Sequence, residues 1–201
     1  MAARPFRRQI DDGILDVAAG LFARRGFAKT SVQDVADAVG LSKAGLLHHF
    51  PSKEALYAAV LGQSEALGAR VLDSVRDLPL GPPRDRRALE VMVDVALAHP
   101  GLVALLIAPV TQGGADAVHD SDVGPAAAAA LQAFGVEVGA PVSERAVRVA
   151  GALAAVAVLS IAASFDDETT AWRPHIVATC IDALGSREPG AGSSVPHQEE
   201  A

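Results

Sequence analysis

Apolar residues recur at helical spacing along most of the chain, and no segment alternates apolar and polar residues as a half-buried strand does. The first stripe predicts a helix over residues 8–25, ended by Gly26. This stripe contains Ile10, Ile14, Val17, Ala18, Leu21 and Phe22. Later stripes predict helices over 31–39, 42–49, 52–76, 84–99, 100–108, 124–138, 143–164 and 174–184. We therefore expect an all-α protein.

Capping residues indicate where the short second helix begins and ends. Ser31 followed by Asp34 predicts a capping box, and Gly40 stands where the helix end needs a left-handed residue. The caps of the next two helices, and the stop between them, are predicted at Ser42, Ser52 and Pro51. Two short helices then meet at a sharp angle around Gly40.

The apolar spacing around Gly40 is typical of a helix-turn-helix, whose second helix enters the major groove of DNA. A small residue, Ala36, stands where the two helices would cross, and Gly40 supplies the tight turn. The apolar anchors on the two sides of the turn are Val35, Val39, Leu41 and Leu46.

Charge is divided unevenly along the chain. Residues 1–56 carry eight Lys and Arg against six Asp and Glu, a net charge of +2, whereas residues 57–201 carry nine against eighteen, a net charge of −9. All three lysines, Lys29, Lys43 and Lys53, lie in the first part. This asymmetry predicts a small module that faces a polyanion and is attached to a larger acidic body.

Other chemistries find little support. A single cysteine, Cys180, excludes an intrachain disulfide and a cysteine-based zinc finger and fits a reducing cytoplasm. His48 and His49 are adjacent, whereas a two-histidine metal site on a helix usually needs a spacing of four, so we expect no metal. The most apolar segment, residues 149–165, falls short of the ~20 residues of a membrane span. No nucleophile motif, phosphate loop or dinucleotide glycine run is present, so we expect neither an enzyme nor a cofactor.

The run "ILDVAAGLFARRGFAKTSVQDVADAVGLSKAGLLHHFPSKEALYAAVL" resembles the DNA-binding region of the tetracycline-repressor (TetR) family of bacterial transcription regulators. The resemblance covers about a quarter of the chain, from residue 9 to residue 61. It implies a homodimer with one DNA-binding head per subunit and an effector pocket in each larger domain. It also implies that an effector moves the long fourth helix and so alters the separation of the heads.

The resemblance also implies roles for single residues. Thr30 and Lys53 occupy positions that typically hold phosphates, and Lys43 and His48 lie on the helix that reads the groove. Further contacts to DNA are expected from Ser42, Ala44 and Leu47. Arg7 and Arg8 are expected to contact DNA as part of a flexible N-terminal arm; the alternative is that these arginines only make the N-terminus soluble. His49 is expected to be half-buried against the core of the head.

Two positions depart from the family pattern in the helix that reads the groove. Gly45 stands where threonine is usual, which removes a side chain that could touch a base. Leu47 stands where tyrosine is common. It cannot donate a hydrogen bond to a phosphate but can contact a thymine methyl group.

We expect three parts: a helix-turn-helix domain at 1–51, a helical effector-binding and dimerisation domain at 52–185, and a disordered tail at 186–201. Pocket candidates in the second part are Met92, His99, Leu105 and Trp172. The helices 143–164 and 174–184 are expected to form a four-helix dimer seam that includes Leu159. Close approach in that seam is expected at Ala150, Gly151, Ala154 and Ala155.

The expected function is that of a cytoplasmic, homodimeric regulator that binds a near-palindromic operator in double-stranded DNA. We expect it to act as a repressor that a small-molecule effector releases, without a membrane partner. Two alternatives remain open. One is a ligand-blind DNA binder whose second domain only dimerises, and the other is an enzyme acting on a small molecule.

Overall fold

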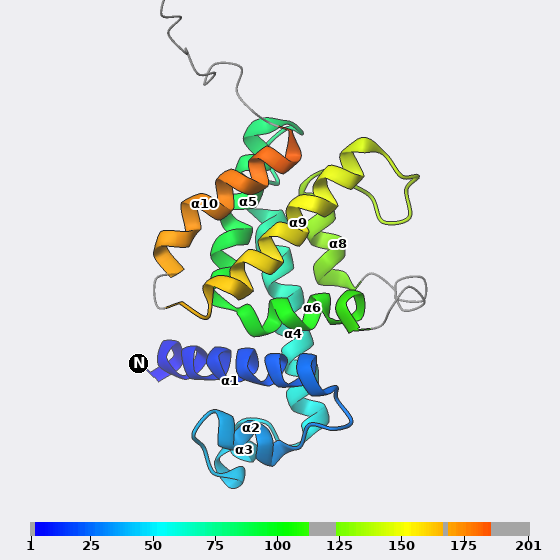
Figure 1. Cartoon of the computed structure of the whole chain (residues 1–201). Coiled ribbons are helices and arrows are strands. Elements are labelled where there is room, and N and C mark those ends of the chain that lie inside the picture. Colours follow the sequence, from blue (N-terminus) through cyan, green and yellow to red (C-terminus); the bar gives the residue numbers. More distant parts are fainter. Residues whose placement is uncertain (1–2, 113–123, 167–168, 186–201) are drawn as a thin grey trace, which may run out of the picture.

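The computed structural model describes residues 3–112, 124–166 and 169–185, with the backbone alone for residues 3–9. Within these ranges the chain forms nine helices and no strand, which confirms the expected all-α fold (Figure 1). The helices are α1 (Ala3–Arg25), α2 (Val32–Ala38), α3 (Lys43–His49), α4 (Lys53–Asp73), α5 (Pro82–Ala98), α6 (Pro100–Gln112), α8 (Pro125–Ala133), α9 (Glu144–Ala163) and α10 (Thr169–Leu184). The predicted tail, residues 186–201, lies outside the described residues.

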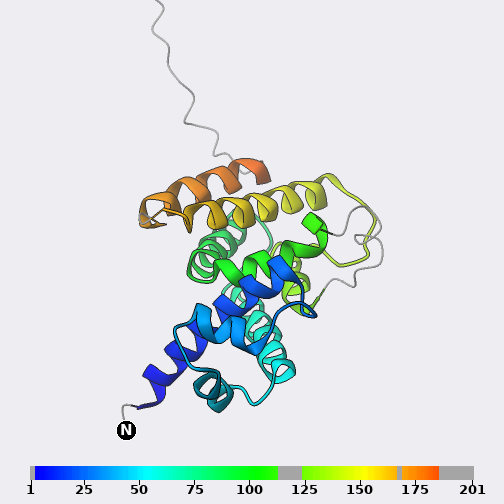
Figure 2. The ribbon, with the colours of Figure 1, turned by 60° about the horizontal axis from the view of Figure 1, so that its bottom comes forward.

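We call α1–α3 the head and α5–α10 the body; α4 runs from one into the other (Figure 1). In Figure 1, α2 and α3 lie below α1, and the body lies above it. Helices α9 and α10 lie side by side along one edge of the body in both views (Figures 1 and 2).

Each part has its own apolar core. The head cluster consists of Ile14, Leu15, Ala18, Ala19, Leu21, Phe22, Val35, Ala36, Leu46, Leu56, Val60 and Leu102. The body cluster includes Val71, Val75, Leu89, Met92, Val93, Phe134, Val149, Ala152, Val156, Ile176, Val177 and Cys180. Helix α4 contributes to both, because its first half packs in the head and its second half in the body.

Several helix boundaries differ from the predicted ones. Helix α10 begins at Thr169, so Pro174 lies inside it instead of in its first turn. Trp172 packs against the body cluster and Arg173 pairs with Asp94, and these contacts hold the turn ahead of the proline. Helix α1 likewise begins earlier than predicted, at Ala3.

Helix α6 also continues past a proline, Pro109, to Gln112, whereas the predicted helix ended at residue 108. The Thr111 hydroxyl donates to backbone carbonyls of the preceding turn, at 3.2 and 3.3 Å. The Gln112 amide donates to the Ala23 carbonyl of α1 at 2.6 Å. These bonds support a last turn that the proline alone would end.

Helix α8 is shorter than predicted because Gly135 ends it in a left-handed conformation, with φ of 70°. The N–H groups of Gly135 and Val136 bond to the Gln132 and Leu131 carbonyls, at 2.9 and 3.1 Å. This pattern is a Schellman motif, which satisfies carbonyls at a helix end.

Helix α6 crosses α1 at very short range. A Cβ atom at Gly101 would overlap the backbone carbonyl of Asp16. The Asp16 carboxylate accepts a hydrogen bond from the Leu102 N–H at 2.9 Å, and the Leu102 side chain is buried in the head cluster. Two residues of the predicted α1 stripe, Ile10 and Val17, are exposed instead. At the crossing, α1 instead turns the side chain of Asp16 toward α6.

An ion pair between the buried Asp85 and the partly exposed Arg145 joins the starts of α5 and α9. The Asp85 carboxylate, in a residue only 3% exposed, accepts two hydrogen bonds from Arg145, at 2.6 and 2.8 Å. Arg145 also donates to the Phe134 carbonyl at 3.0 Å. The neighbouring Arg84 donates to carbonyls near the ends of α4 and α8, at 2.7–3.3 Å. Two guanidinium groups thus hold the end of the body farthest from the head.

By length and composition, α9 could cross a membrane, and the bent pair α5 and α6 passes the same test as one broken span. The core helix of a globular protein passes this test as well. In the structure the inner face of α9 packs in the body cluster through Val149, Ala152 and Val156.

We expect Gly101→Ala to destabilise the protein by about 1–3 kcal/mol, because the added methyl group forces α6 away from α1. Gly13→Ala is the matched control. Gly13 also lies in a helix, and a Cβ there meets nothing within 4 Å. The control should gain up to about 1 kcal/mol from helix propensity. Urea unfolding measures both changes, and a Gly101→Ala protein as stable as the control would contradict the close crossing.

We expect Arg145→Ala to lower the free energy of unfolding by about 3–5 kcal/mol, since it leaves the Asp85 carboxylate buried without its partner. Arg173→Ala removes an arginine from a solvent-exposed pair with Asp94 and should cost about 1 kcal/mol or less. The comparison uses urea unfolding of both variants at neutral pH. Equal losses would mean that burial of Asp85 does not set the cost.

Candidate nucleic-acid interface

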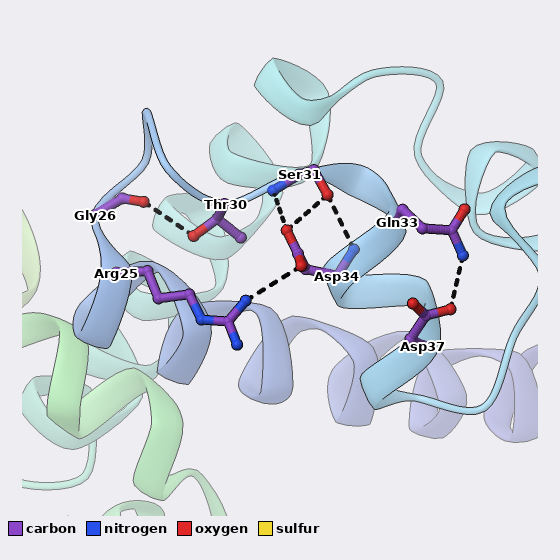
Figure 3. A network of polar contacts seen from close by, with 7 residues as sticks. All are labelled: Arg25, Gly26, Thr30, Ser31, Gln33, Asp34 and Asp37. Carbon is purple, nitrogen blue, oxygen red and sulfur yellow. Dashed lines mark hydrogen bonds and ion pairs between the residues drawn. The ribbon is translucent and has the colours of Figure 1, made fainter.

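The start of α2 is held by a capping box and an ion pair (Figure 3). The Ser31 hydroxyl accepts from the Asp34 N–H at 3.1 Å and donates to the Asp34 carboxylate at 2.6 Å, and the Ser31 N–H donates to it at 2.7 Å. Arg25, at the end of α1, reaches the same carboxylate at 3.2 Å. The Ser31 hydrogen bonds, with a smaller contribution from Arg25, hold the pKa of Asp34 below its usual value. The predicted capping box is confirmed.

The turn between α2 and α3 is a second Schellman motif. Gly40 has φ of 70°, and the Leu41 and Gly40 N–H groups bond to the Ala36 and Asp37 carbonyls, at 2.9 and 3.3 Å. The predicted anchors lie as expected: Val35, Ala36 and Leu46 are fully buried, and Val39 and Leu41 pack against the head cluster. The segment therefore has the geometry of a helix-turn-helix.

Helix α3 turns polar and small side chains to solvent. Ser42, Lys43, Ala44 and His48 are exposed, and Leu47 is half-buried. The Ser42 hydroxyl accepts the Gly45 N–H at 3.0 Å, and its own proton is available for a further partner. A Cβ at Gly45 would lie 3.2 Å from this hydroxyl oxygen, so glycine leaves the cap uncrowded.

The two adjacent histidines have different environments. His49 is half-buried, as predicted, and its Nδ1 lies 2.7 Å from a carboxylate oxygen of Asp11 in α1. His48 points to solvent, with its ring edge-on to that of His49 and the centroids 6.0 Å apart. No group of His, Cys, Asp or Glu that could hold a metal ion occurs among the described residues.

Two positions expected to hold phosphates are engaged within the protein. The Thr30 side chain is 1% exposed and donates to the Gly26 carbonyl at 2.9 Å (Figure 3). This burial is a correction, because the expected phosphate contact requires an accessible hydroxyl. Lys53 donates to the Phe27 carbonyl at 3.0 Å, and its Nζ lies 4.2 Å from the centre of the Phe27 ring. Lys53 is half-buried and keeps two N–H donors for a phosphate.

The four pocket candidates do not share one core. Met92 is in the body cluster and Trp172 packs against it, whereas Leu105 packs against the head cluster because α6 crosses α1 at that point. His99 is the C-cap of α5. The expectation that Leu105 lines a pocket with the other three is therefore corrected. The side chains of Arg7 and Arg8 lie outside the described residues, although their backbone is helical and not a flexible arm.

The anchoring roles of Asp11 and Asp16 could not be predicted from the sequence. Their partners, His49 and Leu102, lie 38 and 86 residues farther along the chain. No local spacing signals a contact at such a distance. Each aspartate reads only as a polar residue in an amphipathic helix.

Known proteins are most similar to this chain in the head and the first part of α4. Residues 14–60 match the family model described as "Bacterial regulatory proteins, tetR family". The transcriptional repressor KstR2 of Rhodococcus jostii is 50% identical over 48 residues, which cover 24% of this chain and 24% of the relative. The regulator RutR of Escherichia coli is 50% identical over 50 residues, covering 25% and 24%. The match spans about a quarter of the length of these curated relatives, whose names describe regulators and not enzymes.

Solved structures align with more of this chain than the curated relatives do, but at lower sequence identity. A TetR-like transcriptional regulator from Rhodococcus sp. RHA1 aligns over 90% of this chain and 97% of its own, with a TM-score of 0.47 and 22% identity. KstR2 of Mycobacterium tuberculosis aligns over 96% and 87%, with a TM-score of 0.41 and 21% identity. Residues 14–60, about a quarter of this chain, thus match the helix-turn-helix region of the TetR family of bacterial regulatory proteins.

Proposed function

We propose that this protein is a cytoplasmic transcription regulator that binds a near-palindromic DNA operator as a homodimer and leaves it when a small-molecule effector binds. The observation that carries the proposal is the family match of residues 14–60 on a capped helix pair whose second helix is exposed. Repression is the mode of action we propose, as in the name of the relative KstR2.

In this proposal α3 lies in the major groove. Its N-terminal residues reach base edges in such a docking. The exposed residues Ser42, Lys43, Ala44 and His48 supply a hydroxyl, an ammonium group, a methyl group and an imidazole to the groove. Leu47 can contact a thymine methyl group from its half-buried position. Lys53 contacts a phosphate beside the groove, while its bonds to Phe27 fix the direction of its side chain.

The outer faces of α9 and α10 form the proposed dimer seam. The outer face of α9 carries Val147, Ala150, Gly151, Ala154 and Val158, all of them exposed. Val147 and Val158 are each 60% exposed in the single chain, which is unusual for valines on a long apolar helix. Ala155 and Leu159, also expected in the seam, are half-buried and pack in part against the body cluster.

Two connections could carry an effector's action to the head. Helix α4 enters both clusters, and α6 is bound to α1 at Asp16. An effector that favours the released arrangement by several kcal/mol would shift occupancy of the operator. The proposed spacing of the two α3 helices on DNA is roughly 34 Å or a multiple of it.

Lys43→Ala should weaken binding to duplex DNA and lower the slope of log affinity against log salt concentration by about 0.9, the value for one lost phosphate contact. Fluorescence anisotropy over a salt series measures both. Arg86→Ala is the control, because Arg86 is an exposed residue of the body and the charge change is equal. An unchanged slope for Lys43→Ala would remove this lysine from the interface.

Val158→Arg should give monomers that bind operator DNA poorly, since an arginine at the centre of the seam leaves a charge buried between two apolar helices. Sedimentation velocity reports the oligomeric state. Val138→Arg, in the exposed loop before α9, should remain dimeric. A dimeric Val158→Arg protein would place the interface elsewhere.

A further inference from the structure

Two buried polar atoms of the body have no hydrogen-bond partner among the described residues. They are Ser160 Oγ, in a residue 0% exposed, and His99 Nδ1. A buried polar atom without a partner costs free energy, and native proteins contain few of them. Other buried hydroxyls of this chain are paired: Ser64 donates to the Val60 carbonyl at 3.1 Å.

The ion pair between α5 and α9 places the two residues, His99 and Ser160, at about the same level of the body. Asp85 and Arg145 bond to each other in the first turns of the two helices, which therefore start together. His99 follows Asp85 by about four turns and Ser160 follows Arg145 by about four turns, so both lie at the end of the body nearest the head.

Trp172, near the start of α10, lies at about the same level of the body as Ser160, near the end of α9. The Cys180 thiol lies 3.5 Å from the Ala152 carbonyl of α9, and α10 runs antiparallel to α9 (Figures 1 and 2). Trp172 precedes Cys180 by about two turns, and Ser160 follows Ala152 by about two turns. Helix α9 contacts α5, α6 and α10, and α10 contacts α5, so Ser160 lies near the end of α9 at which these helices approach one another.

The described residues around this level are largely apolar, with one bonded pair of charges beside them. Trp172, Leu159 and Val103 pack there against the body cluster. The adjacent charges, Asp94 and Arg173, bond to each other at 2.5 and 3.0 Å, and this hydrogen-bonded arginine lowers the pKa of Asp94. Arg70, Arg87 and Glu90 also interact electrostatically with this pair, so the charged groups among the described residues near this level are of both signs.

Resting on the function proposed above, we propose that Ser160 and His99 form the polar end of the effector site, which takes a neutral, largely apolar molecule by a single carbonyl or hydroxyl oxygen. The ligand oxygen accepts from the Ser160 hydroxyl and bonds to His99 Nδ1, so both orphaned atoms gain a partner. Its apolar part packs beside Trp172. Because the His99 carbonyl accepts the Val103 N–H at 3.1 Å, the ligand acts on the first turn of α6, which also binds α1 through Leu102.

The test measures binding of the methyl ketones hexanone, octanone and decanone to the full chain without DNA, by calorimetry. The matching carboxylates, hexanoate to decanoate, are measured in parallel. We expect at least one ketone to bind more tightly than its carboxylate. Ser160→Ala should weaken that ketone about tenfold, the usual size of one hydrogen bond in a dry site. Ser64→Ala, which removes a buried hydroxyl that is already paired, should leave ketone affinity unchanged.

A second readout needs no ligand. Ser160→Ala should raise the melting temperature of the free protein by roughly 2–4 °C, because it removes an unpaired buried hydroxyl, whereas Ser64→Ala should not raise it. Lack of ketone binding, a preference for carboxylates, or a lower melting temperature for Ser160→Ala would each overturn the assignment. Operator binding by the same proteins, measured separately, decides the proposed function: a protein that binds DNA but no ketone refutes only this site.

Discussion

The crossing of α1 and α6 holds the head and the body in one arrangement. Without a side chain at Gly101, the α6 backbone lies against the Asp16 carbonyl, and the Asp16 carboxylate binds the Leu102 N–H. The first N–H groups of a helix have no partner within it, so a carboxylate from another helix both caps α6 and binds it to α1. The Leu102 side chain then completes the head cluster. A displacement at the start of α6 is therefore a displacement of α1.

Three aspartates of α1 bind it to neighbouring helices. Asp11 binds His49 of α3, Asp12 accepts from Gln63 of α4 at 3.1 Å, and Asp16 binds α6. Lys53, at the start of α4, binds the loop after α1, where its ammonium group lies against Phe27. With α1 bound to three other helices, α3 is presented as part of a rigid unit. In the proposed function, such a unit would be reoriented as a whole by movement in the body.

Most of the head could be predicted from the sequence because its signals are local. Ser31 and Asp34 are three residues apart, Gly40 alone sets the turn, and Ser42 and Ser52 directly precede the helices that they cap. Prediction failed where a distant contact outweighed a local signal. Pro174 and Pro109 were expected to bound helices, yet Arg173 pairs with Asp94 and Gln112 binds Ala23, and the helices continue through both prolines.

The sequence alone determined the all-α class, the helix-turn-helix and its exposed second helix, because helical periodicity, capping and glycine turns act within a few residues. Only the tertiary structure decided that Thr30 is buried, that Leu105 packs against the head cluster and that the hydroxyl of Ser160 has no partner among the described residues. The physical reason is that burial and hydrogen bonding of a side chain depend on which surfaces meet. In this chain those surfaces come from helices far apart in sequence, and no local pattern encodes how closely they approach.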